Sequence, residues 1–305
     1  MRQQNWQKAR QSLESIVEQR PADGEAQMLL AEVYGELDLI RNMNMTLDIV
    51  RKLSPKYEDR ADFIRKKYWI KNFKSGYEHL QNKEFEQAIF KFEMVVWLDS
   101  IRTDGYQRLG DAYFLTGRYY NAARAYQKVL EQQPEKVVVK NNLAEIYYLQ
   151  KAYDKAIDLS NEILVSNPND LNALLRRAYS YDALNKFKEA EQAFLEVLTL
   201  QSRPEVMQDL GLLYFRNENY KKAIAQFTRA LERSDDKVLL YRYLGETNRL
   251  ARNYIAMAQW YMKILESDPD DLKSWKNLAI AYEAMGARDK LLEARNQISK
   301  LESMN

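Results

Sequence analysis

Small residues recur along the chain at intervals of 33 or 34 positions, and apolar residues follow each of them in a fixed pattern. Within each period the apolar positions are three, four or seven residues apart, which places them on one face of a helix. Each period holds two such segments, so the pattern predicts pairs of antiparallel helices and no clear strand. The column of small residues is Gly76, Gly110, Ala144, Ala178, Gly211, Gly245 and Ala279.

Further columns describe how the two helices of a pair meet. Three positions after the small residue stands a Tyr in five of the seven periods, and twelve positions after it stands an Ala in five of the seven. Small residues let two helix backbones approach closely, and aromatic side chains fill the space around that contact. The prolines lie between the predicted pairs, where a helix must end. They are Pro21, Pro55, Pro134, Pro168, Pro204 and Pro269.

These columns resemble the tetratricopeptide repeat, whose pattern is W-x₂-L-G-x₂-Y, then A-x₃-F, then P. The resemblance implies an all-α fold, a right-handed α-solenoid of antiparallel helix pairs. It covers nearly the whole chain. The period that matches most fully contains Tyr106, Leu109, Gly110, Tyr113, Ala122, Tyr126 and Pro134.

The phase of the columns divides the chain into three parts. Residues 1–55 are predicted to hold a half repeat and one full repeat, and residues 69–305 seven consecutive repeats, the last acting as a C-terminal cap. From Ala31 to Gly76 the interval is 45 residues, about eleven more than one period. Residues 56–68 are therefore expected to be an insertion, either a longer first helix or a short separate one.

Composition argues against catalysis. The chain has no Cys and one His, which excludes a thiolate nucleophile or a Cys-based zinc site and leaves too few imidazoles for a catalytic metal centre. No glycine-rich phosphate loop is present, and His79 occupies the Tyr column, where we expect it to pack. The chain is predicted not to be an enzyme and to use no cofactor.

Charge and hydropathy limit the partners and the location. With 46 Lys and Arg against 44 Asp and Glu, the formal charge of +2 gives no reason to expect nucleic acid as a partner. No segment approaches the ~18–20 apolar residues of a membrane span. We expect a soluble chain, cytoplasmic, or periplasmic or anchored if an N-terminal segment has been removed. Because the first predicted helix has no preceding partner helix, residues upstream of Met1 are expected to be missing.

The resemblance also implies a ligand groove lined by the first helix of each repeat. Its residues lie three and two positions before the small residue and one and four positions after it. Asn142 and Arg176 match two of the five positions of the carboxylate clamp of chaperone-binding members, so such a clamp is not expected. The groove residues expected to bind ligand are Gln107, Asp111, Phe114, Asn141, Asn142, Glu145, Tyr148, Arg176, Tyr179, Asp182 and Phe215.

A basic cluster is interleaved with aromatic residues just after the insertion. Either it is a phosphate-binding or headgroup-binding patch, or its cations are the solvated side of a helix whose aromatic residues join the core. We favour the second interpretation, because no further basic patch extends the surface. The cations of this cluster are Arg65, Lys66, Lys67, Lys71 and Lys74.

The function predicted from these features is a non-catalytic scaffold for protein–protein interaction. It would bind an extended peptide segment or a partner helix in the concave groove. A self-assembling structural protein is the alternative, and nucleic-acid binding and catalysis rank below it.

Overall fold

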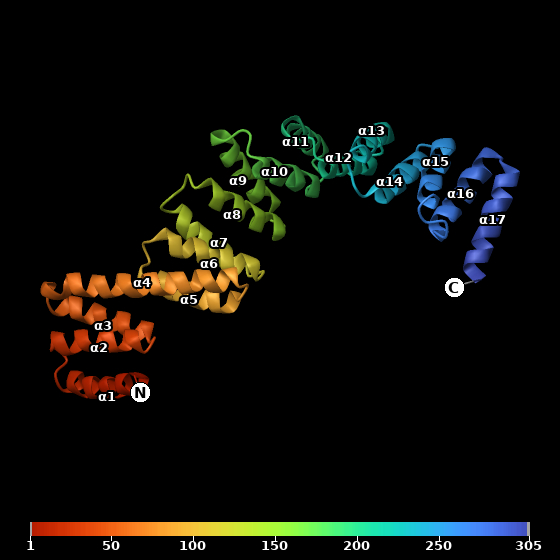
Figure 1. Ribbon diagram of the computed structural model, residues 1–305. Helices are drawn as coiled ribbons and strands as arrows, with labels where there is room; N and C mark the ends of the chain where they lie inside the picture. Colours follow the sequence, from red (N-terminus) through yellow and green to blue (C-terminus); the bar gives the residue numbers. More distant parts are fainter. Residues whose placement is uncertain (1, 304–305) are drawn as a thin grey trace. The chain divides into compact units, whose positions relative to one another are not determined.

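The computed structural model describes residues 2–303 and confirms an all-α fold. This part of the chain forms 17 α-helices and one 3₁₀ turn, η1, and contains no strand (Figure 1). Successive helices form antiparallel pairs, as expected for a helical-repeat solenoid. The chain divides into two compact units, Met1–Gln150 and Lys151–Asn305.

The first unit begins with a single helix, α1, which packs against α2. The pairs α2 and α3, α4 and α5, and α6 and α7 follow, and α8 packs against α7. The bounds are α1 Arg2–Gln19, α2 Gly24–Glu36, α3 Ile40–Leu53, η1 Pro55–Tyr57, α4 Glu58–Gln81, α5 Phe85–Leu98, α6 Thr103–Leu115, α7 Tyr119–Leu130 and α8 Val137–Leu149.

The second unit begins with α9, which packs against α10, and continues as four helix pairs. The last helix, α17, buries only Ala294 and Leu301. The bounds are α9 Tyr153–Ser166, α10 Leu171–Ala183, α11 Phe187–Leu200, α12 Pro204–Arg216, α13 Tyr220–Leu231, α14 Lys237–Leu250, α15 Tyr254–Leu265, α16 Leu272–Met285 and α17 Arg288–Ser303.

The column of small residues lies where an aromatic ring of the second helix meets the first helix. A Cβ added to Gly110 would lie 2.6 Å from Tyr126 Cε1, and one added to Gly211 would lie 2.6 Å from Phe227 Cε1. Carbon atoms do not approach so closely without displacement. The missing side chain is therefore what allows the ring to lie against the backbone of the first helix.

Each pair turns at one residue with left-handed backbone geometry, seven positions after the small residue. Lys83 has φ 62°, Lys151 has φ 60° and Arg252 has φ 57°. This region disfavours residues with a Cβ, yet only two of the eight turn residues are glycine. The full column is Asp38, Lys83, Gly117, Lys151, Asn185, Glu218, Arg252 and Gly286.

The Tyr column links a repeat to the second helix of the preceding repeat. The hydroxyl of Tyr113 donates to Glu93 Oε1 at 2.7 Å, and that of Tyr34 donates to Glu14 Oε1 at 2.8 Å. Burial and the hydrogen bond to Glu93 raise the pKa of Tyr113 to about 12. His79 takes the Tyr position in its repeat, and its Nδ1 lies 2.5 Å from Glu84 Oε2.

Most of the segment 56–68 is the first part of α4, a continuous helix of 24 residues that follows η1. Ala61, Ile64 and Tyr68 face inward, since each is less than 5% exposed. The ring of Tyr68 lies against the backbone of Gly35, and its hydroxyl donates to Glu36 Oε1 at 2.9 Å. The surplus residues therefore lengthen the first helix of this repeat.

Candidate peptide-binding groove

In the first unit, the candidate groove residues lie on α6 and α8 and are all half-buried. Tyr126, on α7, connects the two helices: its hydroxyl donates to Asp111 Oδ1 at 2.7 Å and accepts from Asn142 Nδ2 at 3.2 Å. Arg108 Nη1 lies 3.1 Å from the other oxygen of Asp111. The structure thus brings Asp111 and Asn142 together through one buried phenol.

This hydrogen-bonded chain fixes the orientation of the Asn142 amide. Burial and the Asp111 carboxylate raise the pKa of Tyr126, so its hydroxyl stays protonated and donates to Asp111. Because the phenol proton is used in this way, its oxygen is left to accept from Asn142. The Oδ1 and the second N–H of Asn142 have no partner within the described part of the chain. An ordered amide with one acceptor and one donor to spare suits a peptide backbone.

The other candidates of the first unit differ in how far they are already engaged. Phe114 packs on Tyr119 of its own repeat, with ring centroids 5.9 Å apart. Gln107 is half-buried on α6 and has no hydrogen bond to other described residues. Asn141, Glu145 and Tyr148 are half-buried on α8, on the helix that carries Asn142.

In the second unit, α10 carries Arg176, Tyr179 and Asp182. The hydroxyl of Tyr179 donates to Asp209 Oδ2 on α12 at 2.6 Å, and its ring packs edge-on against Phe194 at 5.4 Å. Asp182 forms an ion pair with Arg216. These contacts order the polar side chains between the first helices of neighbouring repeats.

Two charged groups of the second unit are partly desolvated. Burial lowers the pKa of the Arg176 guanidinium and raises the pKa of the Asp209 carboxyl, where the hydrogen bond from Tyr179 opposes the effect of burial. Phe215 packs edge-on against Tyr220 of its own repeat, with ring centroids 6.2 Å apart. Asn142 belongs to the first unit and Arg176 to the second, so a site centred on both stays a prediction.

The sequence columns include Tyr126 but assign it no part in the groove. It occupies the aromatic column assigned to packing, where Phe and Tyr are equivalent. The only sequence signal was the hydroxyl itself, since Phe92, Phe194 and Phe227 fill the same position in three other repeats.

The cations of the basic cluster face different neighbours. Arg65 contacts Asn44 and forms ion pairs with Asp48 and Asp62, all toward α3 or along α4. Lys67 pairs with Glu36 of α2 at 3.0 Å, and Lys71 lies 3.8 Å from Asp38 in the turn after α2. Lys66 and Lys74 are exposed and have no ion pair among the described residues.

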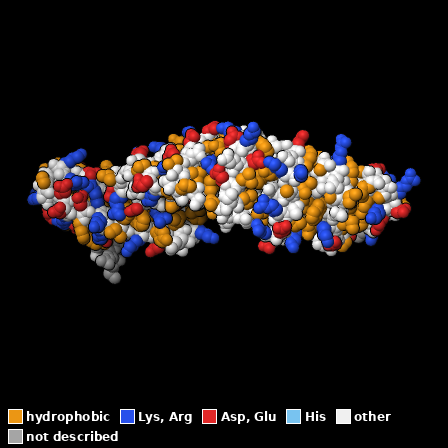
Figure 2. All heavy atoms as spheres, turned by 90° about the horizontal axis from the view of Figure 1, so that it is seen from above, with side chains coloured by type: hydrophobic (Ala, Val, Ile, Leu, Met, Phe, Trp, Pro, Cys, Tyr) orange, Lys and Arg blue, Asp and Glu red, His pale blue; other side chains and the backbone are white. Residues whose placement is uncertain are grey.

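Over residues 2–303, no three His, Asp or Glu side chains are placed to hold a metal ion. None of the described helices combines the length and apolar character needed to cross a membrane. On the face shown in Figure 2, basic and acidic side chains are interspersed with hydrophobic ones.

Paired helices, close contacts at a small-residue column and a polar face on the first helices define a helical-repeat protein. A tetratricopeptide repeat family model matches residues 1–37, 108–171 and 209–272, and a second one matches residues 171–203. The chain belongs to the tetratricopeptide repeat family. It is therefore a repeat scaffold for protein–protein interaction, in a family whose members are generally non-catalytic.

Among characterised proteins, the chain is similar to peroxisomal targeting signal receptors. The receptor of Candida albicans is 24% identical over 220 residues, which cover 68% of this chain and 37% of the receptor. The receptor of Kluyveromyces lactis is 26% identical over 216 residues, 69% of this chain and 38% of the receptor. The chain thus spans well under half the length of these curated relatives.

Two other similarities are more limited. Human protein O-mannosyl-transferase TMTC1 is 25% identical over 175 residues, which make up only 20% of that protein. Among solved structures, MamA from Desulfovibrio magneticus RS-1 superimposes with a TM-score of 0.53 at 20% identity, covering 55% of this chain and 97% of MamA. The likeness to MamA concerns the fold alone.

Proposed function

We propose that the chain binds an extended peptide segment of a partner protein along the first helices of its repeats. The observation that carries the proposal is the ordered amide of Asn142, held by Tyr126 and Asp111 with an acceptor and a donor to spare. An extended peptide presents N–H and C=O groups that pair with such an amide whatever its sequence. The similarity to receptors named for a targeting signal supports a peptide as the ligand.

The charges along the first helices favour a ligand that carries Lys or Arg. Asp111 and Glu145 contribute negative charge in the first unit, and Asp182 and Asp209 in the second. Arg176 offers a place for one carboxylate of the ligand through two parallel hydrogen bonds. We therefore expect basic segments to be preferred over acidic ones.

The test starts from peptides selected by display against the full-length chain. Asn142→Ala should weaken about ten-fold the binding of a selected peptide that occupies the first unit, and Arg176→Ala that of a peptide that occupies the second, because a buried hydrogen bond to a charged or polar partner contributes about 1.5 kcal/mol. The matched controls are Asn296→Ala and Arg288→Ala on α17, both exposed. Circular dichroism should show unchanged helical content in all four variants.

The proposal fails if both groove variants bind within two-fold of the wild type while remaining folded. Sedimentation of the free chain over a range of concentrations addresses the alternative. A size that grows with concentration, and a loss of self-association in Asn142→Ala, would make a second copy of the chain the occupant of the groove.

A further inference from the structure

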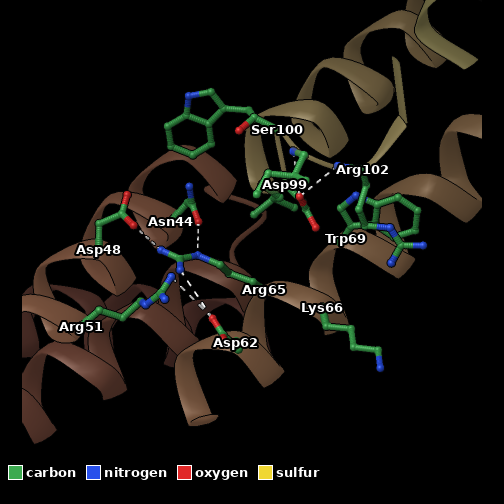
Figure 3. Close-up of a pocket in the computed structure, with 13 residues that line it drawn as sticks. Asn44, Asp48, Arg51, Asp62, Arg65, Lys66, Trp69, Asp99, Ser100 and Arg102 are labelled. Atoms are coloured by element: carbon green, nitrogen blue, oxygen red, sulfur yellow. Dashed lines mark hydrogen bonds and ion pairs between the residues drawn. The ribbon is translucent and has the colours of Figure 1, made fainter. Parts of the chain in front are cut away.

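The first unit contains a pocket of about 640 Å³ that is separate from the groove residues on α6 and α8. We call it the α3–α4 pocket. Its walls are residues 44–51 of α3, residues 62–69 of α4, and the end of α5 with the loop that follows, residues 97–102 (Figure 3). A volume of this size accommodates a few amino-acid residues.

The pocket is a direct result of the lengthened α4. At 1.5 Å per residue, α4 is about 36 Å long and α5 about 21 Å. These two helices are antiparallel and joined by a short turn, so about ten residues at the start of α4 extend beyond the end of α5. The space beside these residues, next to α3, is not filled by the following repeat.

Each carboxylate that lines the pocket is already engaged. Asp62 lies 3.8 Å from Arg51 and 3.7 Å from Arg65, and Asp48 also forms an ion pair with Arg65. Asp99 Oδ1 accepts hydrogen bonds from the backbone N–H groups of residues 101 and 102, at 3.0 and 3.2 Å. Figure 3 shows Arg65 held by Asn44, Asp48 and Asp62.

The hydrogen-bond donors of the pocket, in contrast, are only partly used. Lys66 has no ion pair within the described chain, and its side chain extends away from the Arg65 cluster (Figure 3). The Arg102 guanidinium stacks on the Trp69 ring, 3.9 Å from its centroid, and its one carboxylate contact is Asp104 at 3.4 Å. The buried indole N–H of Trp69 has no acceptor among the described residues.

Apolar surface is exposed beside these donors. Trp97 is 38% exposed and Ile101 is 74% exposed, although both are large hydrophobic residues. The Asp99 side chain holds the backbone of the loop that carries Ile101 and Arg102, and stacking on Trp69 orders the Arg102 guanidinium before any ligand binds.

We propose that the α3–α4 pocket binds a carboxylate of an acidic peptide segment. Lys66 and Arg102 supply the charged hydrogen bonds, the indole N–H of Trp69 supplies a third donor, and Trp97 and Ile101 contact an apolar side chain next to the carboxylate. None of the residues that line this pocket belongs to the groove, and the expected ligand carries the opposite charge.

A carboxylate fits the pocket better than a phosphate. Trp97 and Ile101 expose apolar surface beside the donors. An acidic residue of a peptide brings an apolar neighbour to that surface, whereas a phosphate ion has no apolar part.

The indole N–H groups provide the readout. The chain has five Trp residues, of which Trp69 and Trp97 line the pocket and Trp260 and Trp275 lie in the second unit. The measurement is the position of each indole signal in ¹⁵N–¹H spectra of the full chain, assigned with single Trp→Phe variants. The probe added to the chain is the hexapeptide Gly-Ser-Leu-Asp-Leu-Glu. The comparison probe has Asn and Gln in place of Asp and Glu, with an amidated C-terminus.

The acidic peptide should shift the indole signals of Trp69 and Trp97 and leave those of Trp260 and Trp275 in place. Lys66→Gln and Arg102→Gln should each weaken this binding about ten-fold, as expected for loss of a charge-assisted hydrogen bond. Lys74→Gln, an exposed lysine of α4 outside the pocket, should bind like the wild type. Asn142→Ala should do so as well, which separates this site from the groove.

The proposal is overturned if the Trp69 signal does not respond to the acidic peptide, or if the neutral peptide shifts it equally. It is also overturned if adenosine monophosphate shifts the signal at lower concentration than the acidic peptide does, since the pocket would then be a phosphate site.

Discussion

Gly211 and Phe227 show how one missing side chain sets the distance between two helices. Phe227 is fully buried, and its ring fills the space that a Cβ on Gly211 would need. Tyr126 and Gly110 repeat this arrangement in the first unit. The column of small residues could be predicted from sequence because its period is constant. Which aromatic ring fills the place of the missing side chain could be seen only in the structure.

Gly211→Ala should destabilise the chain by about 1–3 kcal/mol, because the added methyl group overpacks a filled site. Urea unfolding followed by circular dichroism measures the change. In a Phe227→Leu background the same substitution should lower the free energy of unfolding by about 1 kcal/mol less, since the smaller side chain makes room for the methyl group. Equal costs in the two backgrounds would disprove the proposed contact.

The hydrogen bond from Tyr113 to Glu93 could not be predicted in the same way. The Tyr column repeats, but its acceptors lie 20 residues earlier for Tyr34 and Tyr113 and 23 residues earlier for Tyr214. The acceptor is a surface glutamate of the preceding helix, and no packing constraint gives it a fixed period.

These tyrosines should make the stability fall in alkaline solution. The pKa of Tyr113 is raised from its ordinary value of 10.0 to about 12 by burial and by Glu93, so its contribution is complete below pH 10 and is lost as the pH rises from 10 toward 12. Tyr113→Phe should cost about 1 kcal/mol at pH 7 and should reduce the loss of stability between pH 10 and 12. Thermal unfolding at a series of pH values measures both effects. An unchanged alkaline decline in the variant would contradict this assignment.

At the scale of the helix pair, the turn between the two helices is the most regular feature. All eight turn residues are left-handed, but six of them carry a side chain. Sequence patterns did not reveal this column, because it contains Asp, Lys, Asn, Glu and Arg as well as Gly. The tight connection between the helices imposes the backbone geometry whatever the residue.

Replacing such a residue by glycine should therefore stabilise the chain. Lys83→Gly should raise the free energy of unfolding by about 0.5–1 kcal/mol, since it removes the steric cost of a Cβ at φ 62°. Lys74→Gly, in the middle of α4, should lower it by about 1 kcal/mol. Both lysines are exposed, so the opposite signs report backbone geometry alone. The measurement is the shift of the urea midpoint.

The long α4 was predicted in part. The interval between Ala31 and Gly76 revealed about eleven surplus residues, but a longer helix and a separate helix were equally consistent with it. The choice between them depends on Ala61, Ile64 and Tyr68, which are buried along one continuous helix, with Tyr68 in contact with Gly35 of the preceding repeat.

At the scale of the whole chain, the periodic sequence predicted the helices and the face that carries the candidate site. The fixed period places Asn142 and Asp111 on first helices, and the structure has both there, half-buried. The hydrogen-bonded chain through Tyr126 was not predictable, because it depends on how far a phenol reaches between three helices. The ligand-binding role of these residues stays a prediction.

Because each repeat contacts only its neighbours, damage should remain local. Ala190 is fully buried in α11, so Ala190→Trp should raise amide hydrogen exchange in α10 to α13 and leave α2 to α6 as protected as before. Lys188→Trp, on the exposed side of the same helix, should change neither region. A uniform loss of protection in Ala190→Trp would show that the chain unfolds as a single cooperative body.

The contact between Tyr68 and Gly35 also determines the order of the repeats. The Tyr68 ring occupies the space of a side chain on Gly35, which stands four positions after Ala31 in the column of small residues. Of the eight repeats, only this one has glycine at that position. The other repeats carry Leu80, Phe114, Tyr148, Asp182, Phe215, Arg249 and Glu283 at that position. The repeat that begins with α4 can therefore follow only its present predecessor, and a gene rearrangement that moved or copied it elsewhere in the array would place the Tyr68 ring against an occupied site.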